Sequence, residues 1–194
     1  MRHIRFNFNF QKTLQASAFL LRLAGGRMDY IDFLKMLYIA DRECLTEERE
    51  PITGDSVIAM KNGPVLCTVR NLIKEKNSQS EQWHRFIGTH FDQTTKQREV
   101  FAKKKIPGED ELYRYEKIIL ERVFKEHKDQ DLVAYTHTFP EWKKYEQTLN
   151  SPNTKNLPSI TIEDIIEGIG KPGLADNVKD RIADIQDYNK MFGK

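Results

Sequence analysis

The feature that most constrains the fold is a segment beginning near residue 30 whose apolar side chains would cover most of a helix surface. Asp29 suits the N-cap, and Asp32 falls in the first turn, where the helix dipole favours negative charge. The apolar positions are Tyr30, Phe33, Leu34, Leu37, Tyr38 and Ala40. A helix at the surface would keep a polar half. We therefore predict a helix central to the core.

Other helices are predicted on both sides of this segment. Apolar residues recur at helical spacing from Gln11 onward and stop at Gly25-Gly26, which accept the left-handed backbone that ends a helix. Residues 4–10 either form a short strand or lead into this first helix. Further helices are predicted over residues 112–123, 131–138, 141–147, 162–169 and 178–192. Thr161, with Asp164 three residues later, predicts a capping box at the start of the helix over residues 162–169.

Short β elements are predicted in the middle of the chain. Residues 56–60 have the alternation of a strand, and Gly63-Pro64 reads as a turn whose proline opens a helix over residues 65–76. Two runs of strand formers, Trp83 to Phe91 and Glu99 to Ile106, flank a polar stretch and predict a β-hairpin. The expected fold class is therefore α+β and helix-dominated: a compact helical domain with a small antiparallel β-hairpin.

The 194 residues are in the range of one globular domain. Residues 1–147 are predicted to form the helical domain, with the hairpin at about 83–106. Residues 148–160 are polar and contain two prolines, which is typical of a linker or a surface loop. Residues 161–194 are predicted to form a C-terminal helical extension that packs on the same domain.

The composition excludes several classes of protein. Charged residues make up 31% of the chain but nearly cancel to a net charge of +2, so the chain lacks the global field of a histone-like nucleic-acid binder. Nucleic acid is not an expected partner, since no helix-turn-helix pattern with a basic recognition helix is found. The opening residues have neither the apolar run of a signal peptide nor that of a membrane span. Cys44 and Cys67 lack the spacing of a zinc site or a disulfide framework, so we expect a cytoplasmic, reduced setting.

No pattern of reactive residues predicts an enzyme, a metal site or a cofactor. The five histidines lack the spacing of a helical zinc site, and the glycines form no phosphate-binding loop. His84 and His90 are either ordinary polar residues of the hairpin or a pair that shares one of its faces. Cys67, predicted near a helix N-terminus, is either a packed, inert thiol or a reactive one.

A basic run also has two interpretations. Lys103-Lys104-Lys105, joined across the turn by Lys96 and Arg98, could contact phosphates or an acidic protein face. The same lysines could protect a solvated strand edge from aggregation.

The cluster Asp41-Arg42-Glu43, predicted at the end of the central helix, most invites a functional interpretation. Asp41 and Arg42 could form an ion pair that fastens the helix end to the loop carrying Asp55, since the guanidinium binds carboxylates with two hydrogen bonds. A rigid anchor of this kind is also what a binding surface on adjoining loops requires.

Several segments together resemble the Panacea domain, whose family also includes SocA-like and phage-associated proteins. The first signature joins residues 35–43, the run Pro51 to Asp55, and Ala59 with the Gly63-Pro64-Val65 turn. A second lies in residues 132–142. The resemblance covers about residues 11–147 and implies a helix-rich domain with a small β element. The domain-defining or partner-binding positions that it implies are Asp41, Arg42, Gly54, Asp55, Gly63, Pro64, His137 and Trp142.

The resemblance implies an antitoxin of a two-gene toxin–antitoxin system, which neutralises the toxin encoded by the adjacent gene through direct binding. An adaptor that delivers a toxin to a AAA+ protease is the alternative, and a nucleic-acid-binding autoregulator is a weaker one. Aromatic residues on the hairpin and in the tail are candidate contacts with the toxin: Trp83, Phe86, Phe91, Tyr188 and Phe192.

Overall fold

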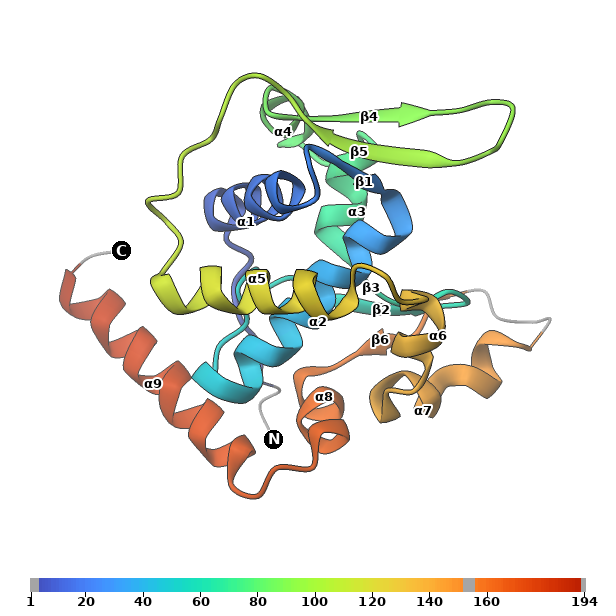
Figure 1. Cartoon of the computed structure of the whole chain (residues 1–194). Helices are drawn as coiled ribbons and strands as arrows, with labels where there is room; N and C mark the ends of the chain where they lie inside the picture. Colours follow the sequence, from blue (N-terminus) through green and yellow to red (C-terminus); the bar gives the residue numbers. More distant parts are fainter. Residues whose placement is uncertain (1–3, 152–155, 193–194) are drawn as a thin grey trace.

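The computed structural model describes residues 4–151 and 156–192, which form helices and two small antiparallel sheets (Figure 1). The helices are α1 (Phe10–Leu23), α2 (Tyr30–Glu48), α3 (Cys67–Ile73), α4 (Ser80–His84), α5 (Arg114–His127), α6 (Leu132–His137), α7 (Pro140–Leu149), α8 (Ile162–Ile169) and α9 (Leu174–Phe192). The strands are β1 (Arg27–Asp29), β2 (Val57–Met60), β3 (Gly63–Leu66), β4 (Ile87–Phe91), β5 (Arg98–Ala102) and β6 (Ser159–Ile160). The predicted α+β, helix-dominated fold class is confirmed.

The α2 helix runs through the middle of the molecule, with α5, α6, β3 and β1 packed around it (Figure 1). Every residue from Phe33 to Asp41 is buried, which confirms that this helix is central to the core. The Asp29 carboxylate caps it by accepting hydrogen bonds from the backbone N–H groups of Ile31 and Asp32.

The α2 helix is longer than predicted. It continues through the buried Cys44 and Leu45 to Glu48 and ends where Arg49 adopts a left-handed φ of 66°. The cluster Asp41-Arg42-Glu43 therefore lies inside the helix and not at its end. The helix is longer because its buried face continues past this cluster, through Cys44 and Leu45.

The predicted hairpin is present, and it belongs to a three-stranded sheet ordered β1-β5-β4. Its strands are shorter than predicted because Trp83 and His84 belong to α4. β5 is the central strand, since β1 pairs with its other side, and Lys103 to Lys105 follow its end. The idea that these lysines protect a strand edge is therefore wrong.

The second sheet is ordered β3-β2-β6, and it corrects the prediction for Pro64. Pro64 does not open a helix but lies in β3, opposite Ala59 of β2. The N–H of Ala59 bonds the carbonyl of Pro158 on the β6 side of the strand, so this position does not need the N–H that proline lacks. The next helix, α3, begins only at Cys67.

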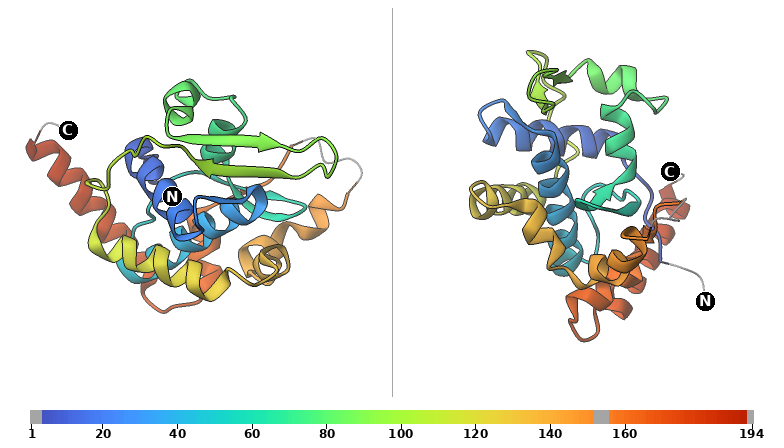
Figure 2. Two further views of the ribbon diagram at one scale, coloured as in Figure 1. Left: turned by 45° about the horizontal axis from the view of Figure 1, so that its top comes forward. Right: turned by 90° about the vertical axis from the view of Figure 1, so that its right-hand side faces the viewer.

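The C-terminal part of the chain returns to the same body. α7 reaches Leu149, β6 pairs with β2, and α8 packs against α7. Thr161 and Asp164 form the expected capping box of α8, and Gly170 ends that helix in a left-handed conformation. The α9 helix follows along one side, and its far end reaches away from the other helices (Figures 1 and 2). None of the helices in residues 4–151 and 156–192 combines the length and apolar character that crossing a membrane requires.

The N-terminal segment is an extended lead-in to α1, so the strand considered for residues 4–10 does not form. It crosses the loop that follows α2, where the N–H of Asn9 bonds the carbonyl of Thr53 at 3.0 Å. Gly54 in that loop has a φ of +65°, and a Cβ atom there would overlap the carbonyl oxygen of Asn7. Only glycine meets both the backbone conformation and the close approach.

The Gly54→Ala substitution is expected to lower the free energy of unfolding by at least about 2 kcal/mol, because left-handed strain adds to a clash with backbone. Gly25→Ala is the matched control: Gly25 has a similar φ of +74°, but nothing lies within 4 Å of the position that an added methyl group would take. The control is expected to cost about 1 kcal/mol. Urea unfolding of the two variants measures the difference, and equal costs would contradict the tight contact at Gly54.

Candidate functional site

The first group of motif residues ties α2 to the loop of residues 51–55 and to α3. The buried Asp41 carboxylate accepts hydrogen bonds from the backbone N–H of Thr53, at 2.9 Å, and from its hydroxyl. Two residues on, the Asp55 carboxylate accepts from the backbone N–H groups of Thr68 and Val69 in the first turn of α3, at 3.0 and 2.9 Å. Asp55 thus caps the next helix from the preceding loop, across β2 and β3.

The electrostatics of these two carboxyl groups are set by burial. Burial raises the pKa of Asp41 to about 7, although the hydrogen bonds from Thr53 oppose the rise. Burial also raises the pKa of Asp55, against the stabilising effect of the α3 N–H groups. Because all these bonds are internal, the group acts as a fastening between elements.

Arg42 forms a second fastening, and its partner differs from the one that the sequence suggested. Its Nε donates to Glu141 Oε1 at 2.7 Å, and its guanidinium lies 4.4 Å from the centre of the Phe139 ring. The Tyr38 hydroxyl donates to the same Glu141 oxygen at 2.9 Å. The expected Asp41–Arg42 ion pair is therefore wrong, since successive helix positions point in different directions.

The third group surrounds the turn between β2 and β3. Lys35 is buried in α2, and its Nζ donates to the carbonyl of Pro64 at 2.7 Å. A Cβ atom at Gly63, whose φ is +98°, would lie 2.6 Å from Thr136 Oγ1 and 2.8 Å from Lys35 Nζ. Gly63 is therefore required by both its backbone and its neighbours, and this turn is tied to α2 and α6.

His137 and Trp142, the two positions of the second signature, lie against each other. Their rings are stacked, with centroids 3.8 Å apart and planes at 7°. The Trp142 Nε1 donates to the carbonyl of Met60 at 2.9 Å, which joins α7 to the end of β2. The buried indole thus has the polar partner that a core tryptophan needs.

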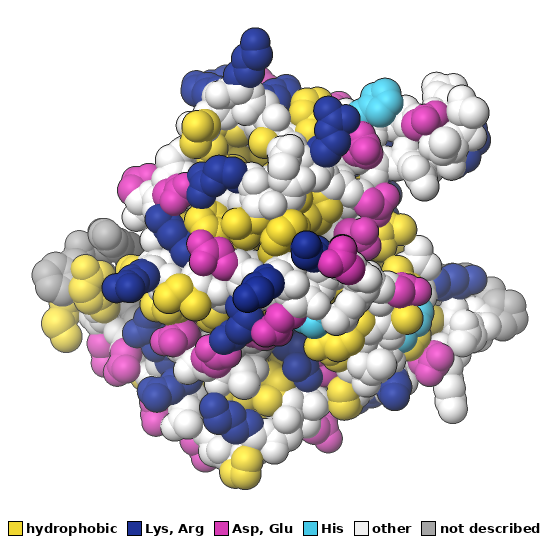
Figure 3. All heavy atoms as spheres, in the orientation of Figure 1, with side chains coloured by type: hydrophobic (Ala, Val, Ile, Leu, Met, Phe, Trp, Pro, Cys, Tyr) yellow, Lys and Arg dark blue, Asp and Glu magenta, His cyan; other side chains and the backbone are white. Residues whose placement is uncertain are grey.

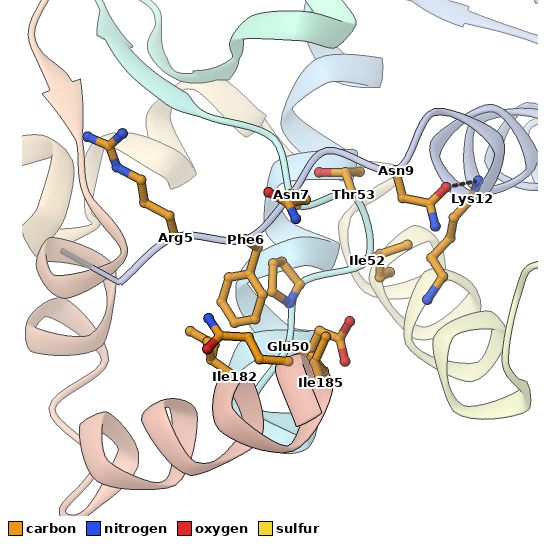
Figure 4. A pocket seen from close by; sticks show the side chains of 13 residues that line it. Arg5, Phe6, Asn7, Asn9, Lys12, Glu50, Ile52, Thr53, Ile182 and Ile185 are labelled. Carbon is orange, nitrogen blue, oxygen red and sulfur yellow. Dashed lines mark hydrogen bonds between the residues drawn. The ribbon is translucent and has the colours of Figure 1, made fainter. Parts of the chain in front are cut away.

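The structure brings the eight predicted positions into one connected frame around α2, but it does not gather their polar atoms around a cavity. Three hollows formed by the described residues border the frame. One, of about 440 Å³, lies between the N-terminal segment, the loop at Gly54 and Asp55, and β6. A second, of about 210 Å³, lies beside Gly54 between the N-terminal segment, the 51–54 loop and α9. Figure 4 shows the Phe6 ring and Ile182 pointing toward each other there. The third, of about 420 Å³, lies beside the β2–β3 turn.

The candidate reactive groups are dispersed. His84 lies in α4 and the exposed His90 in β4, so they do not share a face of the hairpin. Burial raises the pKa of the Cys44 thiol, and Cys67 is half-buried at the start of α3. These positions give no grouping of nucleophile and base.

In the part of the chain that the structure describes, one set of possible metal ligands comes together. Single ligand atoms of Glu43, Glu126 and His127 lie within 4.8 Å of one another. Arg122 already binds the Glu43 carboxylate at 2.7 Å, and its positive charge opposes a cation there. We therefore assign no metal to this cluster.

The aromatic residues predicted as contacts differ in exposure. Trp83 is fully buried, so its expected exposure is wrong, and Phe86 is half-buried beneath Lys105, whose Nζ lies 5.1 Å from the ring centre. Phe91 is 43% exposed and Tyr188 is 52% exposed. The side chain of Phe192 lies outside the described residues.

The sequence model of the family described as "Antitoxin SocA-like, Panacea domain" matches residues 33–143. The match spans more than half of the chain, so the chain belongs to this family of antitoxins. All eight predicted positions fall within the matched range, whereas α1, α8 and α9 lie outside it. Comparisons with curated proteins and with solved structures give no match.

Two residues of the frame, Lys35 and Glu141, were not singled out from the sequence. A lysine between Leu34 and Met36, in a helix that is otherwise apolar on most sides, was an available signal for Lys35. Glu141 gave no comparable signal, because it follows Pro140 in the first turn of a helix, where acidic residues are common.

The Arg42→Ala substitution is expected to lower the free energy of unfolding by about 3 kcal/mol, because it removes the cationic partner that the described residues provide for the buried Glu141 carboxylate. Arg122→Ala is the control. Arg122 binds two carboxylates, but its side chain is 35% exposed, so its loss is expected to cost about 1 kcal/mol or less. Denaturant unfolding of both variants measures the costs, and a cost for Arg42→Ala no larger than the control would exclude its fastening role.

Lys35 is expected to make stability depend on pH. Burial lowers the pKa of its amine from 10.5 to about 7 in the folded state. Between these values the unfolded state binds more protons, so the free energy of unfolding should rise as the pH increases from about 7 toward 10. In Lys35→Met this rise should be much smaller, and in Lys125→Met, at an exposed position, it should persist. Urea titrations over this pH range measure the free energy of unfolding of each variant. If it rises with pH as steeply in Lys35→Met as in the parent, the lowered pKa of Lys35 is not the cause.

Proposed function

We propose that this protein neutralises a toxin by binding it directly. The observation that carries the proposal is the family match over residues 33–143, since the family is one of antitoxins. The expected partner is the protein encoded by the adjacent reading frame. Neutralisation would be steric: the bound domain covers the active surface of the toxin or holds the toxin in an inactive arrangement.

The contacts of the motif residues support binding over catalysis. Asp41 and Asp55 are buried and accept hydrogen bonds from within the fold, and Arg42 is bound to Glu141. Groups held in this way suit a rigid frame, which keeps neighbouring loops in place for recognition. We propose that the eight motif positions act in this way, with the toxin contacting the surface beside them.

The surface around the frame also fits a protein partner. Figure 3 shows basic and acidic side chains interspersed on the face in view, without a broad region of one sign. A specific interface buries about 1,600 Å² and takes most of its affinity from a few aromatic and arginine anchors. Phe91, with the Arg98 guanidinium 5.3 Å from its ring centre at the protruding end of the hairpin, offers such a pair.

The adaptor alternative is favoured by one observation. The far end of α9 exposes Tyr188 and Met191, which are 52% and 76% exposed, so this helix could dock a second partner such as a protease. The half-life of the toxin separates the two mechanisms, because an adaptor shortens it and a steric inhibitor does not.

Co-expression of the adjacent gene's product with this chain is expected to restore growth that the product alone prevents, and the two proteins should purify as a complex. The growth measurement uses an inducible toxin with this chain or with an empty vector, and a pulse-chase experiment follows the toxin. Equal killing with and without this chain would reject the antitoxin role. Rescue accompanied by rapid loss of the toxin would replace direct neutralisation with the adaptor mechanism.

A further inference from the structure

The hollow beside the β2–β3 turn has the shape and lining of a binding pocket. It has a volume of about 420 Å³ and lies between the start of α2, the β2–β3 turn and α3; we call it the Tyr30 pocket. This volume is typical of a site that takes a side chain or a small ligand. Its apolar wall consists of Tyr30, Ile31, Leu34, Met60, Val65 and Leu157.

The charged groups of the Tyr30 pocket all have one sign. Among the described residues that line it, four are basic (Lys35, Lys61, Arg70 and Lys74) and none is acidic. The Lys74 Nζ and the Arg98 guanidinium lie 5.8 and 5.9 Å from the centre of the Tyr30 ring. This concentration of positive charge contrasts with a net charge of only +2 for the whole chain.

The positive charges of the pocket repel one another, since no acidic group among the described lining residues lies between them. Burial lowers the pKa of Lys74, and the neighbouring charges of Arg70 and Arg98 lower it further. Burial likewise raises the pKa of the Tyr30 hydroxyl, while the same two arginines oppose the rise. An incoming anion would therefore relieve repulsion as well as form new contacts.

Lys35 lies at the inner side of the pocket. Its side chain is almost completely buried, and within the described part of the chain its amine donates one hydrogen bond, to Pro64. An ammonium group can donate three hydrogen bonds, so this amine of a lining residue keeps donor capacity. Because burial lowers the pKa of this amine to about 7, a carboxylate that enters the pocket would stabilise its charged form.

We propose that the Tyr30 pocket is where the toxin docks, by inserting an apolar side chain flanked by one or more carboxylates. This inference rests on the proposed function, which provides a protein partner. The aliphatic wall suits a leucine-like or phenylalanine-like group, and the basic residues at its border match the acidic flank. Nucleic acid fits less well, because base stacking uses aromatic faces and Tyr30 is the only aromatic residue in the described lining.

The test compares three full-length proteins: the parent, the double variant Arg70→Glu/Lys74→Glu, and the control Lys125→Glu, which reverses one exposed charge on α5. Isothermal titration against the purified product of the adjacent reading frame gives Kd, and circular dichroism with thermal melting checks the fold. The double variant should raise Kd at least about tenfold, and the control should stay within about twofold.

A second measurement does not depend on the double variant folding. A photo-crosslinking amino acid at the exposed Lys61, at the border of the pocket, is expected to label a toxin segment that contains acidic and apolar residues. Labelling of a basic segment, or none within a complex that still forms, would overturn the docking proposal.

The outcomes separate the two levels of the proposal. If the parent protein does not bind the adjacent gene's product, the proposed function itself fails. If the parent binds and the folded double variant binds equally well, only the pocket assignment fails. If duplex DNA binds the parent, is lost in the double variant and displaces the toxin, the pocket is a nucleic-acid site and the protein-docking assignment is overturned.

Discussion

The arrangement of this protein depends on carboxylates that are buried and held by partners in other elements of the fold. Asp41 connects α2 to the following loop, Asp55 connects that loop to α3, and Glu141 connects α7 to α2. Glu116 in α5 makes a comparable buried pair with Lys12 of α1, at 2.9 Å. Each of these groups loses hydration on folding, so each stabilises the fold only while its partners are in place.

This dependence explains why small residues and tight turns accompany the charges. The loop that supplies Thr53 to Asp41 fits beneath the N-terminal segment because Gly54 has no side chain. The turn at Gly63 leaves room for the Lys35 amine and for Thr136. Where α8 packs against α7, a Cβ atom at Gly168 would overlap the Glu141 carboxylate, so α8 can approach closely only with glycine there. The glycines therefore make room for the buried charged groups and their hydrogen-bond partners.

Helices that begin at a capping residue and carry a clear apolar pattern could be predicted from the sequence. The Asp29 cap and the breadth of apolar residues placed α2, and the Thr161–Asp164 capping box placed the start of α8. Contacts between distant segments had no such signal. The pairing of β6 with β2 and the bond from Arg42 to Glu141, 99 residues away, depend on how the helices stack. Pro64 was misplaced for the same reason, since only the tertiary pairing shows that its strand position needs no N–H donor.

The same distinction applies to the candidate site. The motif marked Asp41, Arg42, Gly54, Asp55, Gly63, Pro64, His137 and Trp142. In the frame, the side chains of Asp41, Arg42, Asp55 and Trp142 form hydrogen bonds within the fold. The Tyr30 pocket, by contrast, is assembled from α2, β2, β3, α3 and Leu157, and no continuous stretch of sequence describes it.

A domain whose defining residues are internal can keep its frame while the surface around it changes. Hydrogen bonds such as those from Thr53 to Asp41 constrain the positions of loops, but they do not constrain which side chains those loops present to a partner. Binding energy in protein interfaces is concentrated in a few exposed anchors, so changes at such positions alter the partner at little cost to stability. A frame of internal residues combined with variable exposed anchors would let one fold recognise toxins of different structure.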